Sequence, residues 1–287
     1  MTAPLSPTTF SPELSQEFGL QIYLTLEIHS ATGSYKDRLG PAAVAEAIAA
    51  GATKVVATSS GNQGLAIAHA ARAAGLPCLI LATRHILPVY RDTLRDLGAE
   101  LQTVPDMKTR TVALHEKIKE GWFPLSVAPE DRGRRVQLGK SGYAAIAREI
   151  VDALGAAPDF LILPVCFGDG CAGMLLGFQQ LARERGTAIP KFIMIRARSS
   201  EDVAFSITAD ATTPEVASTL EATRGISMHF KNADFLEAQR LGQEAGLDLE
   251  AAAAAPFLAL RRYAADPGFP AGSVAVLLFT AKHRPGN

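Results

Sequence analysis

The chain has 287 residues, of which 48% are hydrophobic and 20% are charged, and its formal net charge is −1. This length and apolar content are enough for a sizeable core in one large domain or two smaller ones. The near-neutral charge and the scattered basic residues give no indication of a nucleic-acid partner.

The cysteines, the N-terminus and the apolar runs all favour a protein of the cytoplasm. Cys78, Cys166 and Cys171 are too few for a disulfide framework and lack the spacing of a zinc site. The first residues have neither the basic nor the apolar region of a signal peptide. No apolar run reaches the ~20 residues that a membrane-spanning helix needs, so we expect no membrane partner.

Short apolar runs alternate with Ala- and Leu-rich stretches, which is the pattern of a parallel α/β sheet. In the first half, strands are predicted at 55–58, 77–82 and 100–104, with helices at 62–74, 88–97 and 109–120. In the second half, strands are predicted at 160–165, 192–197 and 274–279, with helices at 144–154, from 170 to about 185, at 233–246 and at 251–264. The segment 124–142 mixes Pro, Gly, Ser and charges and is predicted to be a crossing between two lobes.

The first segment with candidate catalytic residues, 30–40, reads Ser-Ala-Thr-Gly-Ser-Tyr-Lys-Asp-Arg-Leu-Gly. Its turn-forming residues precede Lys36, which is placed to start a helix. A lysine that is shielded from water has a lowered pKa and acts as an amine nucleophile toward an aldehyde. The structural alternative is a solvated helix start, because Asp37 and Arg38 follow directly.

The second segment, 58–64, reads Thr-Ser-Ser-Gly-Asn-Gln-Gly and joins a predicted strand to a predicted helix. Such a junction presents free backbone N–H groups and the positive end of the helix dipole. Ser59, Ser60 and Asn62 add side-chain donors, so the segment suits a carboxylate or a phosphate. An ordinary helix N-cap is the alternative, although the two glycines favour the close approach of a ligand.

The third segment, 164–170, reads Pro-Val-Cys-Phe-Gly-Asp-Gly and also joins a strand to a helix. A glycine-bearing turn at a helix N-terminus suits a phosphate, but many α/β turns contain glycine. Asp169 would repel a phosphate if its side chain pointed inward.

Together the three segments resemble the fold type II pyridoxal-phosphate (PLP) enzymes, which include threonine synthase, cysteine synthase, serine and threonine dehydratases and the tryptophan synthase β chain. The signatures of that group read approximately P-T-G-S-F-K-D-R, S-S-G-N-T-G and P-V-G-G-G-G, and their order and spacing match over nearly the whole chain. Two later segments are similar as well. Residues 250–254 resemble E-P-A-S-A-A, and residues 277–280 resemble the strand-end L-T-G of threonine synthases.

The resemblance implies an α/β fold of two lobes, with parallel-rich sheets flanked by helices and PLP in the cleft between them. It implies a small βαβαβα lobe at 42–128, inserted into a large cofactor-binding lobe made of 1–41 and 129–287. It also implies a homodimer.

The resemblance assigns the cofactor contacts residue by residue. Lys36 would hold PLP as a Schiff base and move protons at the substrate carbons, and Asn62 would hydrogen-bond the ring oxygen. Thr280 would face the pyridine nitrogen, where a neutral hydroxyl favours elimination or replacement over transamination. Backbone N–H groups would bind the phosphate at Gly168, Asp169 and Gly170.

The implied substrate is a small amino acid whose carboxylate is held by Ser59, Ser60 and Gln63. The implied reaction is elimination or replacement at Cβ or Cγ, either threonine-synthase-like or cysteine-synthase-like. A serine/threonine dehydratase is the enzymatic alternative. A non-catalytic binding protein of the same fold is the other alternative.

Two departures from the family pattern bear on these roles. Cys166 and Phe167 stand where the family usually has glycine or small polar residues, so fewer N–H groups would hold a phosphate. After Thr280 the chain reads Ala-Lys-His-Arg, where threonine synthases usually continue Gly-His-Gly. We expect this cationic tail to be solvated rather than to contact an anionic substrate.

Overall fold

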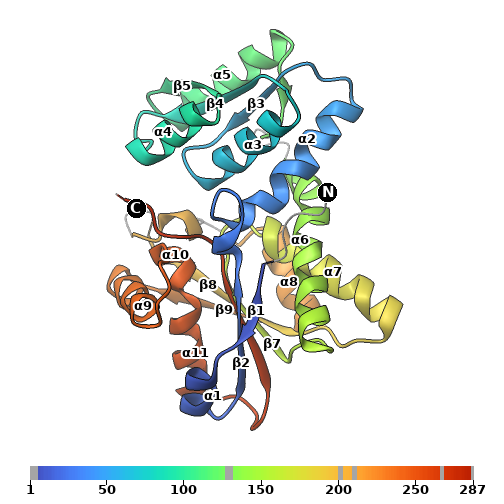
Figure 1. The fold of residues 1–287 in the computed structure, drawn as a ribbon, viewed down its shortest axis with the longest axis vertical. Coiled ribbons are helices and arrows are strands. Elements are labelled where there is room, and N and C mark those ends of the chain that lie inside the picture. Colours follow the sequence, from blue (N-terminus) through green and yellow to red (C-terminus); the bar gives the residue numbers. More distant parts are fainter. Residues whose placement is uncertain (1–5, 127–131, 200–202, 209–211, 266–267, 286–287) are drawn as a thin grey trace. The chain divides into compact units, whose positions relative to one another are not determined.

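The computed structural model describes residues 6–126, 132–199, 203–208, 212–265 and 268–285. The chain forms two compact units (Figure 1). Unit 1 contains the described residues of 1–29 and 143–283, and unit 2 contains those of 30–142 and 284–286. These divisions differ from the lobes inferred from the sequence, and they place Lys36 in unit 2.

Unit 2 is built on a parallel four-stranded sheet in the order β5-β4-β3-β6. Val55, Val56 and Ala57 of its first strand are fully buried, as expected for a strand that is covered by helices on both faces. The elements follow the predicted alternation within a few residues. They are β3 (Val55–Thr58), α3 (Asn62–Ala73), β4 (Cys78–Thr83), α4 (Pro88–Asp96), β5 (Glu100–Val104), α5 (Met107–Lys119) and β6 (Phe123–Pro124).

The lysine segment joins unit 2 through close packing on α3. The 3-10 turn η2 (Tyr35–Arg38) leads directly into α2 (Leu39–Ala49), and both elements contact α3. A Cβ at Gly40 would lie 2.4 Å from the carbonyl oxygen of Ala66. Because only glycine allows this approach, the segment that carries Lys36 is packed firmly on the helix that carries Asn62.

Unit 1 contains a six-stranded sheet in the order β1-β2-β10-β7-β8-β9, in which only the pairing of β1 with β2 is antiparallel. The strands are β1 (Thr8–Phe10), β2 (Gln21–Leu26), β7 (Phe160–Pro164), β8 (Lys191–Ala197), β9 (Ile226–Phe230) and β10 (Val274–Phe279). The helices and 3-10 turns are α1 (Pro12–Phe18), η1 (Glu27–His29), α7 (Asp169–Arg185), η4 (Phe205–Ile207), α8 (Pro214–Thr223), α9 (Asn232–Glu244), α10 (Ala251–Ala254) and α11 (Pro256–Ala265).

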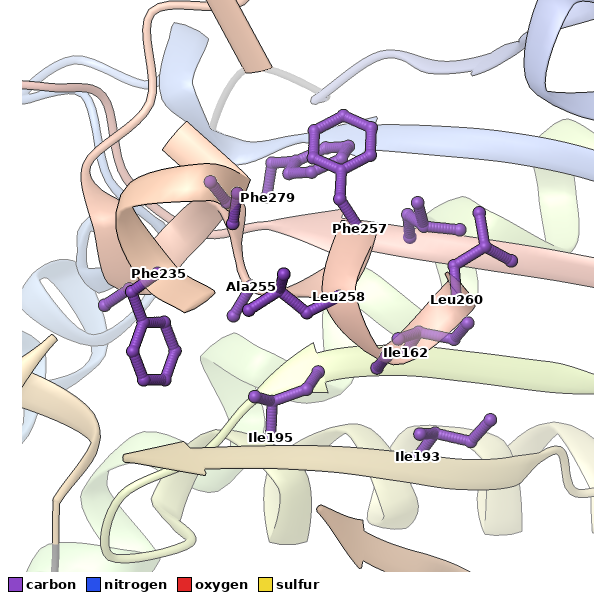
Figure 2. Close-up of a cluster of buried hydrophobic side chains, with 14 of the residues drawn as sticks. Ile162, Ile193, Ile195, Phe235, Ala255, Phe257, Leu258, Leu260 and Phe279 are labelled. Atoms are coloured by element: carbon purple, nitrogen blue, oxygen red, sulfur yellow. The ribbon is translucent and has the colours of Figure 1, made fainter. Parts of the chain in front are cut away.

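The main core of unit 1 lies between this sheet and the helices α9, α10 and α11. Figure 2 shows Leu258 and Leu260 of α11 packed beside Ile162 of β7. Phe257 stacks near Phe279 of β10, with ring centroids 5.0 Å apart. Helices α7 and α8 lie on the other side of the sheet (Figure 1), so the central strands are buried on both faces, as their unbroken apolar sequences predict.

Two predictions about helices are wrong. The predicted crossing at 124–142 is helical from residue 132, because α6 spans Arg132–Leu154, while residues 127–131 lie outside the described part. The predicted helix at 251–264 is two helices, since Pro256 cannot donate a backbone N–H to α10 and begins α11 instead. None of the helices in the described residues is long and apolar enough to cross a membrane.

The turn-like residues near the end of 124–142 have a packing role within α6. A Cβ at Gly142 would lie 2.0 Å from the carbonyl oxygen of Arg38. The helix can therefore pass the turn that carries Lys36 only with glycine at this position.

Gly142→Ala should destabilise the protein. The added methyl group would overlap the Arg38 carbonyl, so we expect the free energy of unfolding to fall by about 1–3 kcal/mol. This loss would occur although alanine is intrinsically the better helix former by about 1 kcal/mol. Urea unfolding measures the change, and Ser141→Ala, at an exposed position of the same helix, is the control. Equal stability of the two variants would contradict the close approach.

Candidate functional site

Lys36 lies in a turn that is closed by its neighbour. The carboxylate of Asp37 accepts hydrogen bonds from the backbone N–H of Thr32 at 2.6 Å and from the Thr32 hydroxyl at 2.7 Å. The Lys36 side chain is half-buried, and its amine lies 4.7 Å from the centroid of the Tyr35 ring. The lysine is therefore partly shielded, which is unlike an ordinary solvated helix start.

A buried hydroxyl precedes this lysine by two residues. Ser34 is 0% exposed, and its Oγ has no hydrogen-bond partner within the described part of the chain. Leaving such a group unsatisfied costs about 1–3 kcal/mol, so the arrangement favours a polar ligand next to Lys36. Ser34 lies within the lysine motif, but the sequence gives no sign that it is buried, because its burial depends on the tertiary packing.

Ser59 holds the turn at the start of α3. Its Oγ accepts hydrogen bonds from the N–H of Gly61 at 3.2 Å and of Gly64 at 2.9 Å. A Cβ at Gly64 would lie 3.1 Å from the Ser59 Cβ, so any larger residue here would press on Ser59. Ser59 thus has the capping role that the sequence left open as an alternative to ligand binding.

Ser60 and Gln63 contact hydroxyls at the carboxyl ends of neighbouring strands. The Ser60 Oγ lies 3.3 Å from the Thr83 hydroxyl and accepts from the Thr83 N–H at 3.2 Å. Gln63 donates to the Ser126 hydroxyl at 3.5 Å, beyond the end of β6. The three proposed carboxylate-binding residues therefore lie at one edge of the unit 2 sheet, within a network of hydroxyls.

Asn62 is the first residue of α3, and its Oδ1 has two donors. The Tyr90 hydroxyl lies at 3.3 Å, and the Nε of Arg284 lies at 3.4 Å. Arg284 is only 7% exposed, whereas Lys282 is exposed. The expectation that the cationic tail is solvated is therefore wrong for Arg284, because this guanidinium packs against Asn62 and Tyr90. A contact that spans 222 residues leaves no signal in the local sequence.

In unit 1, the turn between β7 and α7 carries the predicted phosphate contacts. Gly168 has a φ of +96°, and a Cβ there would lie 2.9 Å from the Glu215 Cβ, so glycine is required. Gly168 is also the N-cap of α7 and has no side chain to accept from the first N–H groups of that helix. These N–H groups, which include those of Asp169 and Gly170, are suited to bind an anion. The buried carboxyl of Asp169 lies in the same turn and opposes this tendency.

Thr280 lies at the same sheet edge as this turn. It directly follows β10, is 6% exposed, and β10 pairs in parallel with β7. The Glu250 N–H donates to the Ala281 carbonyl at 3.3 Å. The two weaker family-like segments, 250–254 and 277–280, are therefore adjacent in the folded protein.

The groups in each unit fit PLP chemically. Unit 2 has a primary amine for an aldehyde, at Lys36, and two residues before it the Ser34 hydroxyl, which has no hydrogen-bond partner among the described residues. Unit 1 has the N–H groups of a helix start for a phosphate and a buried strand-end hydroxyl at Thr280. Among the described residues, no group of three or more His, Cys, Asp or Glu side chains is arranged to hold a metal ion.

Comparison with known proteins agrees with this chemistry. Residues 3–281 match the family model described as "Pyridoxal-phosphate dependent enzyme". Threonine synthase of Halalkalibacterium halodurans is 26% identical to the chain, in an alignment covering 93% of this chain and 78% of that protein. L-serine dehydratase/L-threonine deaminase of Mus musculus is 28% identical, over 63% of this chain and 53% of the mouse protein.

Solved structures share the fold. A PLP-dependent aspartate racemase superposes with a TM-score of 0.82 at 18% identity, covering 99% of this chain and 92% of that one. Maize serine racemase gives a TM-score of 0.81 at 15% identity, with 99% and 90% covered. These identities show the fold alone and confirm the predicted α/β class with parallel-rich sheets flanked by helices. Since the family model spans nearly the whole chain, the protein belongs to the pyridoxal-phosphate dependent enzymes.

Proposed function

We propose that the protein catalyses elimination or replacement at Cβ or Cγ of a small amino acid, with threonine-synthase-like or cysteine-synthase-like chemistry. The observation that carries the reaction class is Thr280, a buried neutral hydroxyl at the end of a central strand. A neutral group opposite the pyridine nitrogen leaves that nitrogen largely unprotonated, which disfavours transamination. The match to a threonine synthase over 93% of the chain supports the same class.

The cofactor, when bound, supplies an electron sink for charge that develops at the substrate Cα. Lys36 would hold PLP covalently through its amine, and the same amine would take up or return the proton at the substrate carbons. Asn62 would donate to the ring oxygen, and Thr280 would face the pyridine nitrogen. The backbone N–H groups that would bind the phosphate are those of Gly168, Asp169 and Gly170.

Ser59, Ser60 and Gln63 would orient the substrate through its carboxylate. The helix dipole at the start of α3 favours an anion here, and orientation of the Cα–H bond toward Lys36 would lower the barrier to proton transfer. Ser59 and Ser60 also hold the turn, so their loss would affect binding and folding together.

A serine/threonine dehydratase is the second candidate. The mouse relative that carries this name supports it, at 28% identity over 63% of the chain. Elimination without replacement requires the same proton transfer at Cα and no second nucleophile. The products therefore separate the two candidates. We also propose a homodimer, as the family resemblance implies, and a cytoplasmic location, as the N-terminal sequence and the sparse cysteines favour.

A substrate screen tests the reaction class. The purified protein is loaded with PLP and offered O-phosphohomoserine, O-acetylserine with sulfide, O-phosphoserine, serine and threonine, with products identified by mass spectrometry. Threonine formed from O-phosphohomoserine or a β-substituted amino acid formed from O-acetylserine would support replacement, and a 2-oxo acid with ammonia formed from serine or threonine would support the dehydratase. Failure to convert any of these compounds would contradict both candidates.

Lys36→Ala should abolish the visible absorption band of bound PLP and the activity together, because the Schiff base requires that amine. Borohydride reduction of the wild-type protein followed by peptide mapping should place the cofactor on Lys36. Lys54→Ala is the control, since Lys54 is a half-buried lysine of the same unit that lies over the Trp122 ring. Recovery of the cofactor on Lys54 or Lys140 would overturn the assignment.

Alkylation of the thiols should report on the proposed phosphate turn. Burial raises the pKa of both Cys78 and Cys171 to about 12, so at pH 8 only about one in 10⁴ of these thiols is ionised. The half-buried Cys166 lies in the turn, so iodoacetamide should modify it first, and PLP should slow that reaction. Peptide mass spectrometry gives the three rates. A rate at Cys166 that saturating PLP leaves unchanged would argue against phosphate binding at 168–170.

A further inference from the structure

Arg284 is a buried cation that connects three segments of unit 2. The chain re-enters this unit at Arg284, after His283 of unit 1. Its Nε donates to the Asn62 Oδ1 at 3.4 Å, its Nη2 donates to the Thr32 carbonyl, and its guanidinium carbon lies 5.3 Å from the centroid of the Tyr90 ring. The side chain is 7% exposed, so it is an integral part of the packing.

The contact with Asn62 determines which way the amide points. A side-chain amide has an accepting oxygen and a donating NH2 group, and the Tyr90 hydroxyl can pair with either one. A guanidinium has only donors. Because Arg284 lies on the same side as Tyr90, the atom that faces both must be the oxygen, and the NH2 group must point away from them.

The contact with Thr32 extends this effect to the lysine turn. Thr32 is fixed from one side by the Asp37 carboxylate through its N–H and hydroxyl. Arg284 fixes it from another side through its carbonyl. The same guanidinium therefore holds the turn of Lys36 and the amide of Asn62 in one arrangement.

The charge of Arg284 favours an anionic ligand near Asn62. Within the described part of the chain its contacts are an amide oxygen, a carbonyl and an aromatic ring, all of them uncharged. A buried cation whose protein contacts are neutral favours a nearby anion. The deprotonated ring oxygen of PLP, to which Asn62 would donate, is an anion of this kind.

We propose that Arg284 is a positioning residue, which turns the Asn62 NH2 group toward the cofactor's ring oxygen and favours the anionic form of that oxygen. The proposal rests on the proposed cofactor role of Asn62. It concerns a residue of this chain that the family signatures quoted above do not include.

Three substitutions of Arg284 separate the effects of its hydrogen-bond donation, its positive charge and its packing. Arg284→Lys keeps a cation that can only donate, and Arg284→Gln supplies a neutral amide that can accept as well as donate. Arg284→Met keeps only apolar bulk. Lys282→Met removes an exposed cation from the same tail and is the matched control. Tyr90→Phe removes the hydroxyl that can pair with either atom of the amide and keeps the contact of Arg284 with the Asn62 oxygen.

The primary readouts are the affinity of the apoprotein for PLP and the visible spectrum of the bound cofactor as a function of pH. We expect Arg284→Met and Arg284→Gln to weaken PLP binding by about 10- to 100-fold, the loss that is typical when a residue that orients a metal ligand is removed. The pH at which the bound cofactor titrates should rise, because the deprotonated form loses a neighbouring cation. Arg284→Lys should restore much of both properties, and Tyr90→Phe and Lys282→Met should resemble the wild type.

Thermal unfolding of the apoproteins identifies variants that fail to fold. If Arg284→Met fails to fold, PLP affinity and the pH titration are compared between Arg284→Lys and Arg284→Gln. Wild-type affinity and an unshifted titration in Arg284→Gln would overturn the proposal, as would equal defects in the Lys and Gln variants. If the wild-type protein itself bound no PLP at Lys36, the proposed function would fail instead, which is a different result.

Discussion

Parallel strand pairing is the constraint on which the candidate residues of each unit depend. In a parallel sheet every strand ends at the same edge, so the helix that follows each strand begins there. In unit 2 this edge joins Ser60 to Thr83 and Gln63 to Ser126. In unit 1 it holds Thr280 and the turn before α7 along adjacent strands. Segments that are far apart in the sequence become neighbours because the strands that precede them run in the same direction.

The hydroxyls at this edge have two functions that are difficult to separate. Ser59 accepts from the N–H groups of Gly61 and Gly64 in its own turn, which would otherwise be available to an anion, and Ser60 accepts from the N–H of Thr83 at the end of β4. A ligand carboxylate at α3 must therefore rely on the remaining N–H groups, on the helix dipole and on Gln63. The Ser34 hydroxyl differs, because it is buried and has no hydrogen-bond partner in the described residues. Unlike Ser59 and Ser60, it thus has an unmet capacity to contact a ligand.

The sequence predicts the buried strands well because they lie under helices on both faces and read as continuous apolar runs, such as 160–164 and 274–279. It does not indicate the strand at 226–230, which is mostly half-buried, or the helical start of α6, whose Gly142 is required by a contact with Arg38. The lysine and asparagine motifs are local and can be recognised. The burial of Ser34 and the contact of Arg284 with Asn62 arise only in the folded chain, so sequence patterns alone give no sign of them.

Two buried charged residues of this chain have no counterpart in the quoted family signatures, and both would act on charges of the cofactor. Asp169 adds a buried carboxyl to a turn that otherwise favours a phosphate. Arg284 adds a buried guanidinium beside Asn62, in contact with the turn that carries Lys36. In the proposed site the first would weaken the electrostatic attraction for the phosphate, and the second would strengthen it for the ring oxygen. Retention of PLP should then depend less on the phosphate turn than on Lys36 and Asn62, whose positions Arg284 holds.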